Sequence, residues 1–81
     1  MKLPRDISGE ELAKRLHVFG YQISRQAGSH LRLTTTLRGE HHITIPRHDS
    51  LKLGTLAGIL GDVAEHFGLT RDEVMAQAFG K

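Results

Sequence analysis

The chain of 81 residues carries a net charge of +2 and contains no cysteine, no tryptophan and only one tyrosine. This length supports one domain, residues 1–81, with a single hydrophobic core, and the absence of thiols excludes disulfides and thiolate metal sites. Because no apolar run reaches the length of a membrane span and the start of the chain lacks a leader-type apolar core, we expect a soluble cytoplasmic protein.

The first predicted element is a helix over residues 9–19. Ser8 and Glu11 form a capping box, in which the serine hydroxyl caps a backbone amide and the glutamate reaches back. Leu12, Leu16 and Phe19 then recur at helical spacing. The next residue is a glycine, which suits the left-handed conformation that ends a helix.

Three stretches that follow alternate apolar and polar side chains with the period of a β-strand. They cover residues 21–26, 30–37 and 41–46 and are separated by glycine-containing turns, which predicts an antiparallel meander. The apolar set would line one face: Tyr21, Ile23, Leu31, Leu33, Ile43 and Ile45. The polar set would line the other: Gln22, Ser24, Gln26, His30, Arg32, Thr34, Thr36, His42 and Thr44.

Two further helices are predicted. Gly54-Thr55 precedes a helix with an apolar stripe, Gly68 ends it, and a second capping box at Thr70 and Glu73 begins a short terminal helix. The expected fold is therefore α+β, in the order α-β-β-β-α-α, with the helices on the apolar face of a three-stranded antiparallel sheet. The first helix, the three strands and one covering helix match the layout of double-stranded-RNA-binding domains, an analogy of fold that says little about activity.

Positive charge is concentrated in the predicted strands. Residues 21–52 contain five Arg or Lys against two Asp or Glu, whereas residues 53–81 contain two against four. This distribution favours a polyanion as the partner. A small surface excess of arginine that only aids solvation stays open as the alternative.

The sequence gives little reason to expect a metal or a cofactor. His41 and His42 are adjacent on a strand and so point to opposite faces, and no acidic ligand lies at a spacing typical of zinc. The turn residues Gly28 and Gly39 stand alone, without a Walker or dinucleotide pattern. His17 and His66 lie near helix ends and are interpreted as surface histidines.

Other kinds of site are also disfavoured. A triad of Ser29, His30 and Asp49 is unlike known nucleophile arrangements, because neighbouring side chains on a strand diverge. The few aromatic residues all fall at core-type positions, which argues against stacking of bases on rings. If RNA binds, we expect phosphate and 2′-hydroxyl contacts from the polar face.

Several segments together carry a family resemblance, in the same order over nearly the whole chain. They are Leu3-Pro4, Ser8-Gly9 with Glu11-Leu12, Gly20-Tyr21, Arg25-Gln26 with Gly28-Ser29-His30, Thr44-Ile45-Pro46 with His48, and Gly54-Thr55-Leu56 with Ile59-Leu60. This combination resembles the HicA (YcfA) family of mRNA interferase toxins. The Arg-Gln-x-Gly-Ser-His and Gly-Thr-Leu segments are its most specific parts.

The resemblance implies a metal-independent endoribonuclease that cleaves mRNA, acts as the toxin of a type II toxin–antitoxin system, and is neutralised by a HicB-type antitoxin. The active histidine of the family falls on His30. Its second histidine falls on His48, to which we assign a supporting role. The sequence departs from the family at Ala57-Gly58, where a basic residue is expected, and in a second helix about one turn longer.

Four residues near His30 are expected to assist it. Arg32 and Arg25 are the nearest cations for the charge that develops on a phosphate during cleavage, and Gln26 and Ser29 can donate hydrogen bonds. Strand parity places Arg25 on the apolar side, unless the turn at Ala27-Gly28 re-aims it.

Two other functions stay open from the sequence. One is a non-catalytic RNA-binding module that inhibits translation by occupancy. The other is an interaction domain with no affinity for RNA.

Overall fold

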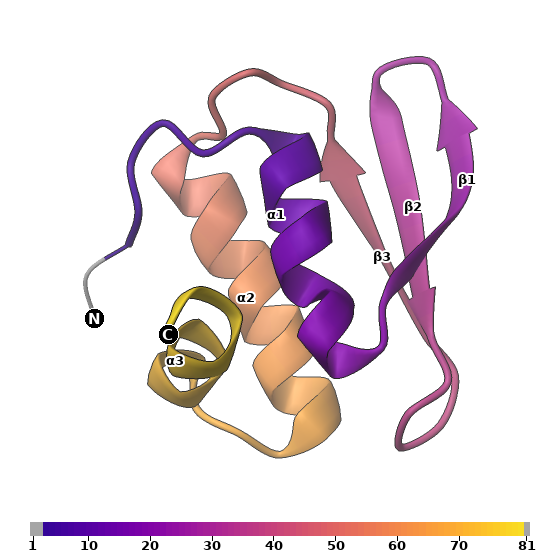
Figure 1. The fold of residues 1–81 in the computed structure, drawn as a ribbon, viewed down its shortest axis with the longest axis vertical. Helices are drawn as coiled ribbons and strands as arrows, with labels where there is room; N and C mark the ends of the chain where they lie inside the picture. Colours follow the sequence, from indigo (N-terminus) through magenta and orange to yellow (C-terminus); the bar gives the residue numbers. More distant parts are fainter. Residues whose placement is uncertain (1–2, 81) are drawn as a thin grey trace.

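The structure, a computed structural model, describes residues 3–80 and confirms the predicted order of elements (Figure 1). Outside this range lie Met1, Lys2 and Lys81. The first two belong to the N-terminal stretch in which no leader is expected. The elements are α1 (Gly9–Arg15), a 3-10 turn η1 (Leu16–Phe19), β1 (Gln22–Ala27), β2 (His30–Thr35), β3 (His41–Pro46), α2 (Leu53–Phe67) and α3 (Arg71–Phe79).

The first helix begins at the predicted residue but has only the serine half of the predicted capping box, because the Glu11 carboxylate accepts from Arg15 at 2.8 Å, and it ends differently. The amide of Glu11 donates to the Ser8 hydroxyl at 3.0 Å. The α-helical part stops at Arg15, and the last turn tightens into η1 before Gly20, which has a φ of 82°. Helix and 3-10 turn together cover the predicted residues 9–19.

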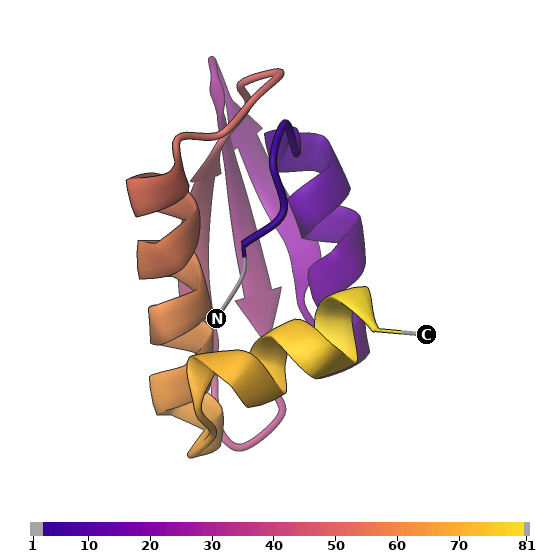
Figure 2. The same cartoon turned by 90° about the vertical axis from the view of Figure 1, so that its left-hand side faces the viewer.

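The strands form one antiparallel sheet in the order β1-β2-β3, and all helices lie on the same side of it (Figure 1). Figure 2 shows α1 and α2 in front of the strands, with α3 crossing near their ends. The core lies between these two layers. Its largest fully buried apolar side chains are Tyr21, Leu12, Leu16, Leu31, Leu33, Ile45, Leu56, Leu60, Val63 and Val74.

Four predicted boundaries and one predicted core residue need correction. β1 begins at Gln22 and ends at Ala27, one residue later at each end than predicted, although Tyr21 is fully buried. β2 ends at Thr35, so that Leu37 lies outside it and is half exposed. α2 begins at Leu53, so Gly54-Thr55 forms its first turn and does not precede it. Ile23 is 43% exposed, because β1 is an edge strand that the helices only partly cover.

α1 approaches the end of β3 at Gly9. The Gly9 amide donates to the His48 carbonyl at 3.0 Å, and a Cβ on this glycine would collide with the carbonyl oxygen of Pro46. The glycine therefore lets the helix lie directly against the chain that follows β3. In contrast, a Cβ on Gly58 in α2 would meet nothing within 4 Å.

We predict that Gly9→Ala destabilises the protein by about 1–3 kcal/mol, the usual range for atoms forced into a packed contact. Gly58→Ala is the matched control and should be neutral or stabilise by up to about 1 kcal/mol, because alanine favours an exposed helix. Denaturant unfolding of both variants measures the difference. Equal stability of the two variants would show that the close approach at Gly9 is unimportant.

A cluster of histidine and tyrosine side chains closes the end of the sheet away from the β1–β2 turn. The Tyr21 hydroxyl lies 2.8 Å from His41 Nδ1, and the His41 and His66 rings stack with centroids 4.4 Å apart. His66 Nε2 lies 2.9 Å from the Leu37 carbonyl and 3.1 Å from that of Gly39. His66 therefore anchors the β2–β3 turn and is more than a surface residue.

Both groups of this hydrogen bond are held neutral. Burial, together with the charge of Asp62, raises the pKa of Tyr21 to about 12. Burial lowers the pKa of His41, helped by His66 and His42 and opposed by Asp62 and Glu65 on α2. Protonation of His41 is thus less favourable in the folded state than in the unfolded state.

Stability should therefore fall as the pH drops below about 6.5, the ordinary imidazole pKa, towards the lower folded-state pKa of His41. Above about pH 6.5, His41 is neutral in both the folded and the unfolded state, and its titration takes nothing from the free energy of unfolding. His41→Gln should flatten this part of the profile, whereas His17→Gln, at an exposed position, should leave it unchanged. The measurement is the free energy of unfolding between pH 5 and 8. An identical pH dependence in His41→Gln and the unmodified protein would contradict the assignment.

Candidate nucleic-acid interface

The side of the sheet that the helices leave uncovered, called the open face below, carries the polar residues of the strands. Cross-strand pairs place His30 beside Ala27 and Pro46, and Arg32 beside Thr44. His41 and His42 point to opposite sides, as expected: His41 pairs with the buried Thr35, and His42 pairs with Thr34. The open face is therefore polar and accessible along its length.

An extra residue in β1 changes which side chains share this face. The register shifts between Ile23 and Arg25, so that Ser24 is inserted as a bulge and Arg25 pairs directly with Arg32. A bulge of one residue reverses the parity of the strand beyond it. Arg25 therefore lies on the open face, and the element that re-aims it is the bulge and not the Ala27-Gly28 turn.

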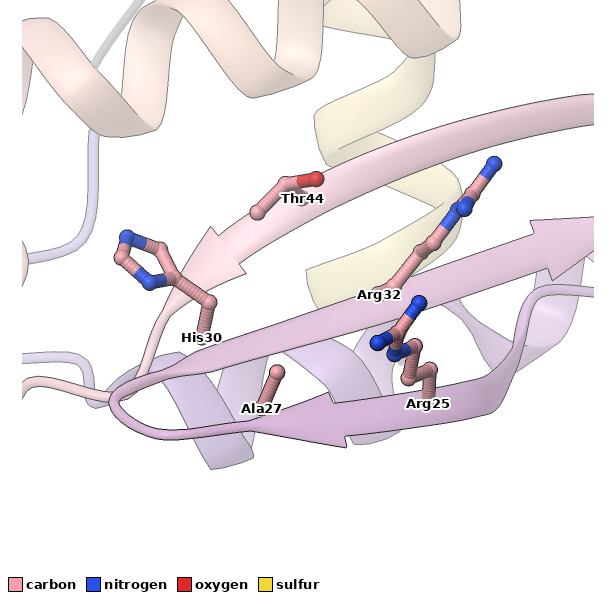
Figure 3. A pocket seen from close by; sticks show the side chains of 5 residues that line it. All are labelled: Arg25, Ala27, His30, Arg32 and Thr44. Carbon is pink, nitrogen blue, oxygen red and sulfur yellow. The ribbon is translucent and has the colours of Figure 1, made fainter.

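A shallow depression of about 190 Å³ lies at this part of the open face. It is lined by Arg25, Ala27, His30, Arg32 and Thr44 (Figure 3). Figure 3 shows the His30 ring near the turn end of β2 and the two arginine side chains rising side by side from β1 and β2. The site therefore combines one imidazole with two adjacent cations.

The structure does not bring every predicted residue into this depression. Gln26 pairs with Leu31 and so belongs to the helix side of the edge strand, contrary to its predicted place on the polar face. Ser29 lies in the β1–β2 turn, where its carbonyl accepts from the Arg47 amide, and His48 lies in the loop after β3. Thr44 and Ala27 are additional lining residues, and strand parity pointed only to Thr44.

A second group of polar side chains, called the polar ladder below, crosses the open face next to the depression. Ser24 Oγ lies 2.8 Å from Thr34 Oγ1, Thr34 Oγ1 lies 2.7 Å from His42 Nδ1, and His42 Nε2 lies 2.7 Å from Glu40 Oε2. Ser24 Oγ also donates to the Arg32 carbonyl at 3.2 Å. Sequence analysis did not find these contacts, because they depend on the register across three strands.

The charges around the depression are unbalanced. Arg47 pairs with Glu10 at 3.1 Å, and Arg15 pairs with Glu11 at 2.8 Å. Within residues 3–80, neither Arg25 nor Arg32 has a carboxylate at ion-pair distance. The two guanidinium groups therefore keep their positive potential towards solvent.

Within residues 3–80, no three His, Asp or Glu side chains are grouped closely enough to hold a metal ion. No helix in this range has both the length and the apolar character needed to cross a bilayer.

The open face thus presents an exposed imidazole and two arginines that have no carboxylate at ion-pair distance within the described residues. The family model described as the HicA toxin of bacterial toxin-antitoxin systems matches residues 9–66, from the start of α1 to the last turn of α2. This match covers more than two thirds of the chain, and the chain belongs to the HicA toxin family. The family is known for mRNA interferases, and a toxin of this kind has an antitoxin as its partner. Neither a curated protein nor a solved structure matches the chain.

Proposed function

We propose that this HicA toxin is a metal-independent endoribonuclease that cleaves mRNA and uses His30 as its general acid/base. The observation that carries the proposal is the direct cross-strand pairing of Arg25 with Arg32 next to His30. Like charges placed directly opposite each other destabilise a sheet. A bulge that creates such a pair on a solvent-exposed face does not stabilise the sheet, and binding of an anionic ligand would account for it.

In the proposed reaction, the 2′-oxygen of a ribose attacks the neighbouring phosphorus in line, and the bond from phosphorus to the 5′-oxygen breaks. His30 either takes the proton of the 2′-hydroxyl or gives a proton to the departing 5′-oxygen, and water exchanges the other proton, so that a 2′,3′-cyclic phosphate and a 5′-hydroxyl result. Imidazole suits this task because it titrates near neutral pH. The requirement for a 2′-hydroxyl would make the enzyme specific for RNA.

The two arginines would bind the phosphate and stabilise the charge that develops on it. Guanidinium groups match the geometry of phosphate oxygens and stay charged at any working pH. Electrostatic stabilisation of this kind is often the largest contribution to catalysis. We assign His48, Ser29 and Gln26, which lie outside the depression, supporting roles in positioning the RNA or the turn.

We further propose that a HicB-type antitoxin inhibits the toxin by covering the open face. An acidic surface would complement Arg25 and Arg32. The exposed edge strand β1 also offers backbone groups for an added strand of the partner. Either contact would hide the depression from RNA.

His30→Ala should lower the rate of RNA cleavage by about 10²- to 10⁴-fold, the usual contribution of a general acid/base. Binding of RNA should persist, because both arginines remain. Since His30 is exposed, the variant should fold normally. The measurement is cleavage of a purified transcript in EDTA, followed on a gel, with His17→Ala on η1 as the matched control.

The same assay separates the alternatives. Cleavage by His30→Ala at the unmodified rate would contradict the role of His30. Loss of cleavage in EDTA would contradict metal independence. RNA that is bound but stays intact with the unmodified protein would favour inhibition by occupancy, and no binding at low salt would favour a pure interaction domain.

Arg25→Ala and Arg32→Ala should each weaken RNA binding and its dependence on salt. Loss of one phosphate contact to a single strand makes the plot of log binding constant against log salt concentration shallower by about 0.7. Fluorescence anisotropy with a labelled RNA at several salt concentrations measures this slope. Arg5→Ala, at an exposed position before α1, is the control. An unchanged slope for both variants would exclude these arginines as phosphate ligands.

A further inference from the structure

The polar ladder lies next to the arginine pair on the open face, on the side of the pair away from His30. Thr34 follows Arg32 by two residues on β2, which corresponds to about 7 Å along the strand. His30 lies the same distance on the other side of Arg32. A nucleotide whose phosphate is held by the arginines can therefore reach the ladder with its base.

The protons of the ladder run in one direction when His42 is neutral. The Glu40 carboxylate can only accept, so His42 Nε2 must carry the proton and donate to it. His42 Nδ1 is then an acceptor, and the Thr34 hydroxyl donates to it. Ser24 has a single hydroxyl proton, which Thr34 Oγ1 at 2.8 Å and the Arg32 carbonyl at 3.2 Å then share as acceptors. Every hydroxyl and imidazole proton of the ladder is thus already in use.

The ladder consequently offers only acceptors to a ligand. These are the remaining lone pairs of Ser24 and Thr34 and the carboxylate oxygens of Glu40. The side chain of Glu40 is 67% exposed and that of His42 is 37% exposed, so a ligand can approach. A phosphate carries acceptors and negative charge and is repelled here, whereas the exocyclic amino group of a base is a donor and fits.

We propose that the polar ladder selects a nucleotide next to the cleaved bond by accepting hydrogen bonds from the exocyclic amino group of its base. Adenine, cytosine and guanine carry such a group, and uracil does not. Recognition by edge contacts also agrees with the positions of the aromatic residues: Phe19, Tyr21 and Phe67 are buried in the core. This inference rests on the proposed endoribonuclease activity.

The test is the cleavage-site profile on an RNA library with random sequence, read by sequencing the ends of the products. The unmodified protein should disfavour uracil at one position flanking the cut by about fivefold or more. Glu40→Gln replaces one acceptor by an amide that also donates, and should remove this bias. Ser24→Ala and Thr34→Val should weaken this bias. Ser24→Ala provides the test if Thr34→Val fails to fold. Glu65→Gln on α2 and Ser50→Ala in the loop before it are the matched controls and should keep the profile.

The outcomes distinguish this inference from the proposed function. If the unmodified protein leaves the whole library intact, the endoribonuclease proposal fails and the inference falls with it. If it cleaves without disfavouring uracil, or if Glu40→Gln and Ser24→Ala cleave with an unchanged profile, only the role of the ladder is overturned. A loss of the uracil bias in these variants, with the bias kept in the controls, supports it.

Discussion

The single extra residue in β1 determines the chemistry of the open face. Without the bulge at Ser24, the alternation of side chains along β1 would turn Arg25 to the helix side of the sheet, away from Arg32 and His30. With it, Arg25 stands directly opposite Arg32, within the same depression as His30. The inserted serine is also used, because its hydroxyl bonds to the Arg32 carbonyl and to Thr34. One irregularity thus builds both the cationic pair and one end of the polar ladder.

This arrangement is possible because the helices cover only one side of the sheet. The core lies between β2, β3 and the helices. The packing that stabilises the domain therefore does not require apolar side chains on the open face. The two ends of the sheet also differ. Tyr21, His41 and His66 form a hydrogen-bonded and stacked cluster at one end, whereas His30 lies exposed at the other. Histidine therefore has a structural role at one end and is available for chemistry at the other.

Charge is divided between two parts of the open face, as the proposed binding of one RNA strand requires. The arginine pair presents donors and positive charge, which attract phosphate, and the ladder presents acceptors and the carboxylate of Glu40, which exclude it. A phosphate and its base would therefore be directed to different parts of the same surface. An antitoxin that covers this surface would need to complement both parts, which is a demand on shape as well as on charge.

The sequence alone determined the order of the elements, the serine cap at Ser8, the capping box at Thr70, the strands around His30, and the family resemblance that the match to residues 9–66 confirmed. These features depend on neighbours a few residues apart, which sequence periodicity records directly. Only the tertiary structure decided that Arg25 faces the open side, that Gln26 does not, that Ser24, Thr34, His42 and Glu40 are connected, and that His66 holds the β2–β3 turn. Each of these depends on the register between strands or on the packing of α2 against a turn. Strict alternation cannot reveal a bulge, because the position of the extra residue is set by its partners on another strand.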